Sequence, residues 1–198
     1  AKMASKREIM RVTKHYTPFS DDDVAKLFGL TFSIKMNKPD WYWLPLMALY
    51  SGARLGELAN LAVADFGIHD DVKFYLIRIG KTADSRRVVP LHSALIDFGL
   101  WEYVEHLRSL GQTHLFGHRP PTMRSKSLGL RWGKWVADSG IKDNTKVFHS
   151  FRSTVITDLY AAAAPNGAAI RDTVGHSGGM RGVHGIYVST LPMETLVK

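Results

Sequence analysis

Six side chains suited to phosphate chemistry are spread along this chain of 198 residues: Arg54, Lys81, His149, Arg152, His176 and Tyr187. A guanidinium presents a planar fork of donors that matches a phosphate, and an imidazole can donate to phosphate oxygens or move a proton. A phenol becomes a nucleophile when a base or a positive field lies beside it. The set therefore indicates a phosphate clamp with a nucleophile at its edge.

The first arginine lies in the segment Ser51-Gly-Ala-Arg-Leu-Gly-Glu-Leu58. Gly52 favours a turn, so Arg54 is expected to open a short helix with Glu57 on the same face, one turn on. Glu57 would then hold the guanidinium so that its remaining donors face a phosphate. The alternative is an ordinary surface Arg–Glu pair.

Lys81 lies in Ile79-Gly-Lys-Thr82, between two runs rich in β-forming residues. A P-loop is excluded, because position 75 is Tyr where that motif needs Gly and a second strand is predicted where it needs a helix. A lysine at a hairpin tip can deliver a proton to a leaving oxyanion if nearby cations lower its pKa. An exposed turn lysine is the alternative.

The last third of the chain carries His149-Ser-Phe-Arg152, then His176 after Val174-Gly, and Tyr187 eleven positions later. A spacing of three at a helix start predicts one shared face for His149 and Arg152, while Phe151 points into the core. Taken singly, these residues could be a capping histidine, a surface arginine, a solvent-facing histidine and a packing tyrosine.

The amino-acid composition limits the kinds of partner and site that the chain can have. Lys and Arg number 26 against 18 Asp and Glu, a net charge of +8, which favours a polyanion such as nucleic acid or an anionic membrane surface. There is no cysteine, so disulfides and thiolate metal sites are excluded, and no stretch resembles a membrane span. We expect a cytoplasmic protein without cofactor or metal. The acidic residues Asp21–Asp23 suit the first turn of a helix, so they need no metal to explain them, and His114 and His118 lack a metal-binding motif.

The elements that must position these residues are mostly helices. Ser20 is a predicted N-cap, and Pro45 is expected in the first turn of its helix. Residues 74–79 and 86–89 predict a β-hairpin, and 111–123 a loop. Helices are predicted over 21–30, 41–51, 55–63, 93–110 (capped by Ser93), 127–139, 148–163 and 168–175. The fold class is mostly α with a small antiparallel β-sheet (α+β).

In their order, these motifs resemble the catalytic domain of the tyrosine recombinases, the phage integrase family. The family's first box, roughly T-G-x-R-x-x-E-L, stands here as S-G-A-R-L-G-E-L. Phe151 replaces Leu in the box H-x-L-R, and Val174 replaces Leu in L-G-H. The interval from His176 to Tyr187 is slightly longer than is usual in the family.

The resemblance covers residues 18–190 and implies the fold of that catalytic domain. Residues 1–17 are then a basic N-terminal arm or linker remnant, and 191–198 a C-terminal tail. We expect an isolated catalytic domain, because no N-terminal helical domain fits before residue 18.

The resemblance also implies an activity, the cleavage and rejoining of DNA strands by a site-specific recombinase of a phage or prophage mobile element. Tyr187 would form a covalent 3′-phosphotyrosyl intermediate, Lys81 would protonate the leaving oxygen, and His149 would assist proton transfer. The transition state would be stabilised by Arg54, Arg152 and His176. Expected partners are double-stranded DNA attachment sites and, on DNA, three further copies in a tetrameric synapse; the isolated chain would be a monomer, associated with a bacterial nucleoid.

Two other functions remain open on the same residues. A type IB topoisomerase shares this kind of active site and would relax supercoils without exchanging strands. A non-catalytic DNA-binding regulator could use the same fold.

Overall fold

The computed structural model describes residues 16–29, 32, 38–78, 86–117 and 121–161, the side chains of 121–125 and 160 excepted. The described part is mostly helical with one small antiparallel sheet, as predicted. Its elements, in chain order, are α2 (Asp21–Leu27), α3 (Pro39–Ser51), α4 (Leu55–Ala59), the 3-10 helix η2 (Val63–Asp65), β1 (Phe66–His69), β2 (Val72–Ile77), β3 (Arg87–Pro90), α5 (Ser93–Asp97), α6 (Leu100–Ser109), α7 (Pro121–Asp138) and α8 (Ser150–Ala161).

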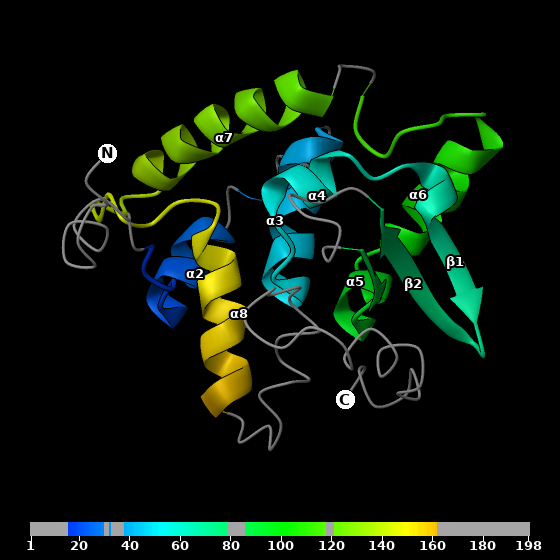
Figure 1. Ribbon diagram of the computed structural model, residues 1–198. Coiled ribbons are helices and arrows are strands. Elements are labelled where there is room, and N and C mark those ends of the chain that lie inside the picture. Colours follow the sequence, from blue (N-terminus) through cyan, green and yellow to red (C-terminus); the bar gives the residue numbers. More distant parts are fainter. Residues whose placement is uncertain (1–15, 30–31, 33–37, 79–85, 118–120, 162–198) are drawn as a thin grey trace, which may run out of the picture.

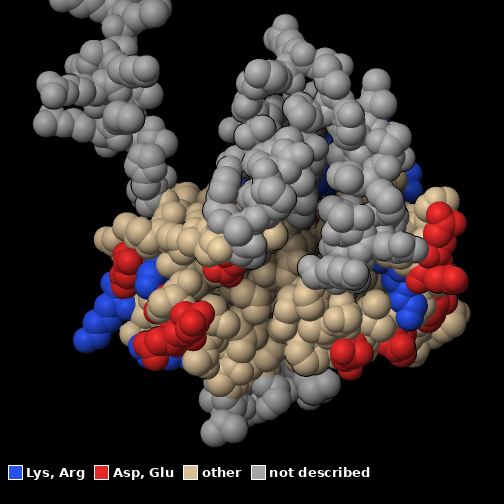
Figure 2. Space-filling view, turned by 90° about the horizontal axis from the view of Figure 1, so that it is seen from below, with Lys and Arg blue, Asp and Glu red and all other residues tan. Residues whose placement is uncertain are grey.

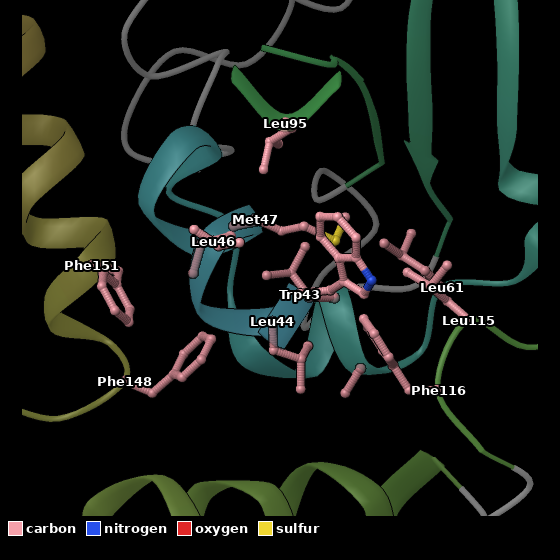
Figure 3. Close-up of a cluster of buried hydrophobic side chains, with 14 of the residues drawn as sticks. Trp43, Leu44, Leu46, Met47, Leu61, Leu95, Leu115, Phe116, Phe148 and Phe151 are labelled. Carbon is pink, nitrogen blue, oxygen red and sulfur yellow. The ribbon is translucent and has the colours of Figure 1, made fainter. Parts of the chain in front are cut away.

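Helix α3 runs through the middle of the core. It packs on α8 on one side and on α4 and α5 on the other, while α7 crosses the α4 end of the molecule (Figure 1). Figure 3 shows its Trp43 and Met47 among side chains from both sides of the core. Because α3 is apolar on every face, it is buried on most of its circumference.

The sheet has three antiparallel strands in the order β1-β2-β3. The predicted hairpin is confirmed as β2 and β3, with Tyr75 opposite Val89. The sequence analysis missed β1, a short strand that contains Gly67 and pairs with β2. The two strands are joined by Asp70 and Asp71, both at positive φ (46° and 62°), as a two-residue hairpin turn requires.

The predicted single helix over 93–110 is wrong, because the chain breaks into α5 and α6. Gly99 separates them with a φ of 89°, a conformation that ends one helix and redirects the next. The N-cap of α5 is also not the predicted Ser93. It is His92, whose Nδ1 accepts a hydrogen bond from the Ala94 N–H at 3.1 Å.

Prolines account for two further corrections. Helix α3 begins at Pro39, so Pro45 lies in its interior rather than in the first turn. Helix α7 begins at Pro121, inside the region predicted to be a loop, and proline is well suited to a first helical position. The predicted short helix over 168–175 lies outside the described residues.

Residues 16–19 attach the start of the described chain to α8. The Phe19 N–H donates to Thr154 Oγ1 at 2.8 Å, and Ser153 Oγ donates to the carbonyl of Tyr16 at 3.3 Å. The Phe19 ring packs on Phe151, with centroids 4.9 Å apart. Ser20 then caps α2, as predicted, through a reciprocal pair of bonds with Asp23. We call residues 16–19 the N-terminal strap.

None of the described helices is long and apolar enough to cross a bilayer. Figure 2 shows the lower face, where the visible acidic and basic side chains of the described residues lie mostly toward the two sides.

Candidate active site

The site begins where α3 ends. Gly52 terminates α3 in the left-handed conformation, with φ at 62°, and its N–H donates to the carbonyl of Ala48 at 2.9 Å. A residue with a Cβ atom adopts this conformation at a cost, so the glycine is needed for the sharp exit of the chain. Two residues later, Arg54 stands in extended backbone as the residue that precedes α4.

Glu57 holds Arg54 as the sequence predicts. Its Oε1 accepts from Arg54 Nη1 at 2.6 Å, and its Oε2 accepts from the Arg54 backbone N–H at 2.9 Å. The carboxylate is buried, with the residue only 4% exposed. The alternative of a surface pair is therefore wrong for Glu57.

A third bond to this carboxylate comes from a residue that the sequence analysis did not single out. Arg87 Nη2, on β3, donates to Glu57 Oε2 at 2.8 Å, and Arg87 is itself only 6% exposed. One signal was available in the sequence: Arg87 alternates with Val89 and Leu91, all of which are buried. An arginine in phase with buried apolar residues of a strand needs a partner in the interior.

The pKa of Glu57 reflects these contacts. Burial on its own would raise the pKa of the carboxyl. The hydrogen bond and charge of Arg87, together with the two bonds from Arg54, outweigh burial and lower the pKa below its usual value. Glu57 is therefore an anion at neutral pH, although it is out of contact with bulk water.

Arg152 reaches the same place from α8. It is 1% exposed, and its Nη1 donates to the carbonyl of Gly52 at 3.0 Å. Burial, followed by the charges of Arg54 and Arg87, lowers its pKa to about 9, against a smaller opposite effect of Glu57. Arg152 thus remains protonated at neutral pH in a place that already holds positive charge.

These four residues form what we call the arginine cluster: Arg54, Glu57, Arg87 and Arg152. Two guanidiniums pair with one carboxylate and the charge of a third acts on the same group, so the cluster has an excess of positive charge at neutral pH. Its members come from positions as far apart as 54 and 152 and from three different elements. A phosphate group would offset the repulsion that lowers the pKa of Arg152.

His149 directly precedes α8, and its carbonyl accepts from the Arg152 N–H at 3.1 Å. The shared face predicted for the two side chains is not what the structure has, since His149 is exposed and Arg152 is buried. The helical spacing rule does not apply, because His149 lies outside the helix. Its ring instead lies 5.6 Å, centroid to centroid, from that of Tyr16 in the N-terminal strap. Phe151 points into the core, as predicted.

Three predicted site residues, Lys81, His176 and Tyr187, lie outside the described part of the chain. Tyr75 is buried beneath the arginine cluster on β2, and burial raises its pKa to about 12. Such a phenol is protonated and shielded, which makes Tyr75 a packing residue rather than a nucleophile.

Across residues 16–161, leaving aside the undescribed gaps, no group of three or more histidine or acidic side chains is placed to hold a metal ion. His114 lies beside Thr113, with its Nδ1 2.9 Å from the hydroxyl oxygen, and His118 is outside the described residues. Asp23 of the acidic triplet bonds to Ser20 and pairs with Lys146.

Comparison with solved structures finds the same fold in several recombinases. The XerH site-specific recombinase, in a post-cleavage complex with its palindromic difH substrate, is 19% identical with a TM-score of 0.64, over 83% of this chain and 48% of that one. The lambda integrase catalytic core is 20% identical with a TM-score of 0.56, over 84% of this chain and 95% of that one. The chain thus spans about half the length of the XerH chain but almost all of that catalytic core.

A lambda integrase tetramer bound to a Holliday junction is also similar, at 16% identity and a TM-score of 0.58, over 90% of this chain and 54% of that one. No curated protein sequence matches the chain. Residues 20–188, which include all six residues suited to phosphate chemistry, match the phage integrase family. The chain belongs to the phage integrase family.

Proposed function

We propose that this chain is the catalytic domain of a tyrosine-type site-specific DNA recombinase, an enzyme that cuts and rejoins DNA strands. The observation that carries the proposal is the arginine cluster, in which Arg54 and Arg152 converge in a buried site with surplus positive charge. Those two arginines lie in segments that resemble two motifs of the phage integrase family, within the residues that match the family. A site of this kind suits a phosphodiester, which carries one negative charge and gains another as it is attacked.

In the proposed reaction the phenol oxygen of Tyr187 attacks the scissile phosphorus. A bond forms from that oxygen to phosphorus, and the bond from phosphorus to the 5′ oxygen breaks. The phenol proton leaves with the assistance of His149, and the 5′ oxygen takes a proton from Lys81. The charge of the five-coordinate transition state is stabilised by Arg54, Arg152 and His176.

Rejoining is the reverse attack, by the 5′ hydroxyl of the same or another strand on the phosphotyrosyl group. The bond energy is kept in the protein–DNA linkage, so the sequence of steps uses no ATP and no metal ion.

The partners belong to the same proposal. Similar structures are described as bound to a difH substrate, to a core site as a dimer, and to a Holliday junction as a tetramer. We propose that this chain acts on double-stranded attachment sites of a phage or prophage element, as a tetramer on DNA and a monomer without it. Residues 18–190 would be the catalytic unit, 1–17 an arm and 191–198 a tail, and the enzyme would work on the bacterial nucleoid in the cytoplasm.

The test is the capture of the covalent intermediate. The protein is incubated with a pool of nicked duplexes that carry randomised cores, together with duplexes from the DNA that flanks its gene. The nick lets the short 5′-hydroxyl strand leave, so rejoining fails and the adduct accumulates. We expect a detergent-resistant, protease-sensitive adduct, and peptide mass spectrometry should locate the linkage on Tyr187.

Tyr187→Phe should bind the same duplexes and give no adduct, because the attacking oxygen is gone. Tyr160→Phe, the other tyrosine that follows His149, is the matched control and should form the adduct as the wild type does. An adduct in Tyr187→Phe shows that the nucleophile is another residue. A wild type that binds selected duplexes without ever forming an adduct is the regulator instead.

Strand exchange between two labelled sites separates recombinase from topoisomerase. A recombinase yields products that join one label to the other, whereas a type IB topoisomerase only changes the linking number of a supercoiled plasmid.

A further inference from the structure

Arg87 occupies a position where an apolar residue would be expected. It lies on β3 in phase with Val89, opposite Ile77 of the neighbouring strand, and only 4% of its side chain is exposed. Burial of an ion pair costs desolvation, and well-packed apolar residues often stabilise a fold as well or better. A purely structural role therefore explains poorly why a guanidinium stands there.

The contact that Arg87 makes is directed at the residue that orients Arg54. Glu57 accepts from Arg54 through both of its oxygens, one to the side chain and one to the backbone. Arg87, 30 residues further along the sequence, adds a second donor to Oε2. Because both of its oxygens are hydrogen-bonded, the Glu57 carboxylate is held in one orientation. The guanidinium of Arg54, which is bonded to that carboxylate, is therefore held in one orientation as well.

We propose that Arg87 is a positioning residue of the active site, which fixes the Glu57 carboxylate so that Arg54 is presented to the scissile phosphate. This inference rests on the proposed function and adds a residue outside the six already assigned. Arg87 has a second effect, since its charge also acts on Arg152 and contributes to the surplus that favours an anion.

Among the described residues, the titratable groups that interact with Glu57 through hydrogen bonds or charge come from several elements. They are Arg54 at the start of α4, Arg87 on β3, Arg152 on α8 and Tyr75 on β2. Arg87 is the strongest of the influences that keep the carboxyl ionised. Without it, burial should raise the pKa of Glu57, and the carboxylate should lose its charge, and its hold on Arg54, at a higher pH than in the wild type.

The first experiment does not depend on the enzymatic activity. The protein is labelled with ¹³C in its glutamate carboxyls, and Glu57 is assigned by comparison with Glu57→Gln. Its titration is followed by NMR in the wild type, Arg87→Met and Arg87→Lys. We expect Arg87→Met to shift the Glu57 titration upward by about one pH unit or more, and Arg87→Lys to shift it less.

Arg108→Met is the matched control. Arg108 is also an ion-paired arginine, bonded to Glu105 and donating to the carbonyl of Phe66 at 3.1 Å, but it is not in the arginine cluster. It should destabilise the fold without moving the Glu57 titration. An unchanged titration in Arg87→Met overturns the proposal, whatever the activity of the wild type.

The second experiment uses adduct formation in a single turnover on saturating nicked duplex. Arg87→Met should slow adduct formation about tenfold or more and leave the duplex dissociation constant within about twofold. As the pH is lowered, the rate of Arg87→Met should begin to decrease at a higher pH than the rate of the wild type. Arg87→Lys should recover part of the rate.

Coupling to Glu57 gives the last test. If Arg87 acts through Glu57, the double variant Arg87→Met, Glu57→Gln should be no slower than Glu57→Gln alone. If instead the rate loss of the double variant equals the product of the two single losses, Arg87 acts independently of Glu57 and the positioning role is refuted. A wild type without any adduct would refute the proposed function, while the NMR titration would still decide whether Arg87 governs Glu57.

Discussion

Arg152 is the residue at which folding and the proposed chemistry make opposite demands. Burial and the charges of Arg54 and Arg87 lower its pKa to about 9, so its charged form is less favourable in the folded chain than in the unfolded one. The stability associated with this group is greatest above its unfolded pKa and is lost as the pH falls through about 9. At neutral pH the full penalty is present, and a bound anion would reduce it.

Replacement of Arg152 by methionine should therefore separate stability from activity. We expect Arg152→Met to be as stable as the wild type at pH 7, or more stable by up to about 3 kcal/mol, in urea unfolding. Adduct formation should fall by on the order of 10²–10³-fold, as when one donor to a developing oxyanion is removed.

Arg131→Met is the control for that measurement. Arg131 pairs with Asp40 at an exposed position, so its loss should change the free energy of unfolding by less than about 1 kcal/mol. A strongly destabilised Arg152→Met would show that the bond to Gly52 outweighs the repulsion, contrary to this prediction.

Glu57 has a pH dependence of the same sign, but in a much lower pH range. Its pKa is lowered on folding, so it contributes stability above its unfolded pKa, about 4.3, which is lost as the pH falls through the lower folded value. Glu57→Gln should therefore be less stable than the wild type by about 3 kcal/mol at pH 7, and the difference should shrink below pH 4. Urea unfolding between pH 7 and pH 3 measures this. Glu105→Gln, at an exposed ion pair, should show almost no difference at any pH.

At the scale of elements, the exit of the chain from α3 decides where Arg54 stands. Gly52 and Gly99 both adopt positive φ, 62° and 89°, but only Gly52 is in contact with the arginine cluster. Gly52→Ala and Gly99→Ala should each cost about 1–2 kcal/mol of stability. Only Gly52→Ala should also slow adduct formation on saturating duplex, because it displaces Arg54 and the carbonyl bonded to Arg152. Equal losses in both variants would mean that the glycine acts through stability alone.

The elements that the sequence predicts well are those with a local signature. Ser20 with Asp23 is a capping box, and the alternation around Tyr75 and Val89 is a strand pattern, so α2 and the β2–β3 hairpin could be predicted. The break at Gly99 was missed because the apolar positions on both sides continue one helical pattern. Strand β1 was missed because four residues with a glycine carry little periodicity.

In the site, too, contacts between residues close in sequence could be predicted, whereas contacts between distant residues could not. The pairing of Arg54 with Glu57 follows from a spacing of three residues and was predicted. The contact between Arg87 and Glu57 joins residues 30 apart on a strand and a helix, and no local rule gives it. The burial of Arg152 beside His149, which is exposed, depends on the packing of α8 against α3, which is a tertiary effect.

The whole molecule carries a net charge of +8 and has a mass of 22.2 kDa. Like charge opposes self-association of such chains in solution, and a duplex neutralises it. Analytical ultracentrifugation should therefore find a monomer without DNA and, on a recovered attachment site, species up to four copies per synapse. Raising the salt concentration from 50 to 200 mM should dissociate the complex, since phosphate contacts release counterions. Tetramers of the free protein would contradict the prediction.

The N-terminal strap places the entry of the chain on the helix that carries Arg152. Phe19 and Tyr16 are hydrogen-bonded to α8 at Thr154 and Ser153, and the Tyr16 ring lies against His149. A torque on the chain just before Tyr16 would thus act on the first turn of α8 through two hydrogen bonds and one ring contact. The helix that carries Arg152 is thus mechanically coupled to the N-terminal strap, so that a load on the strap would be transmitted to this helix.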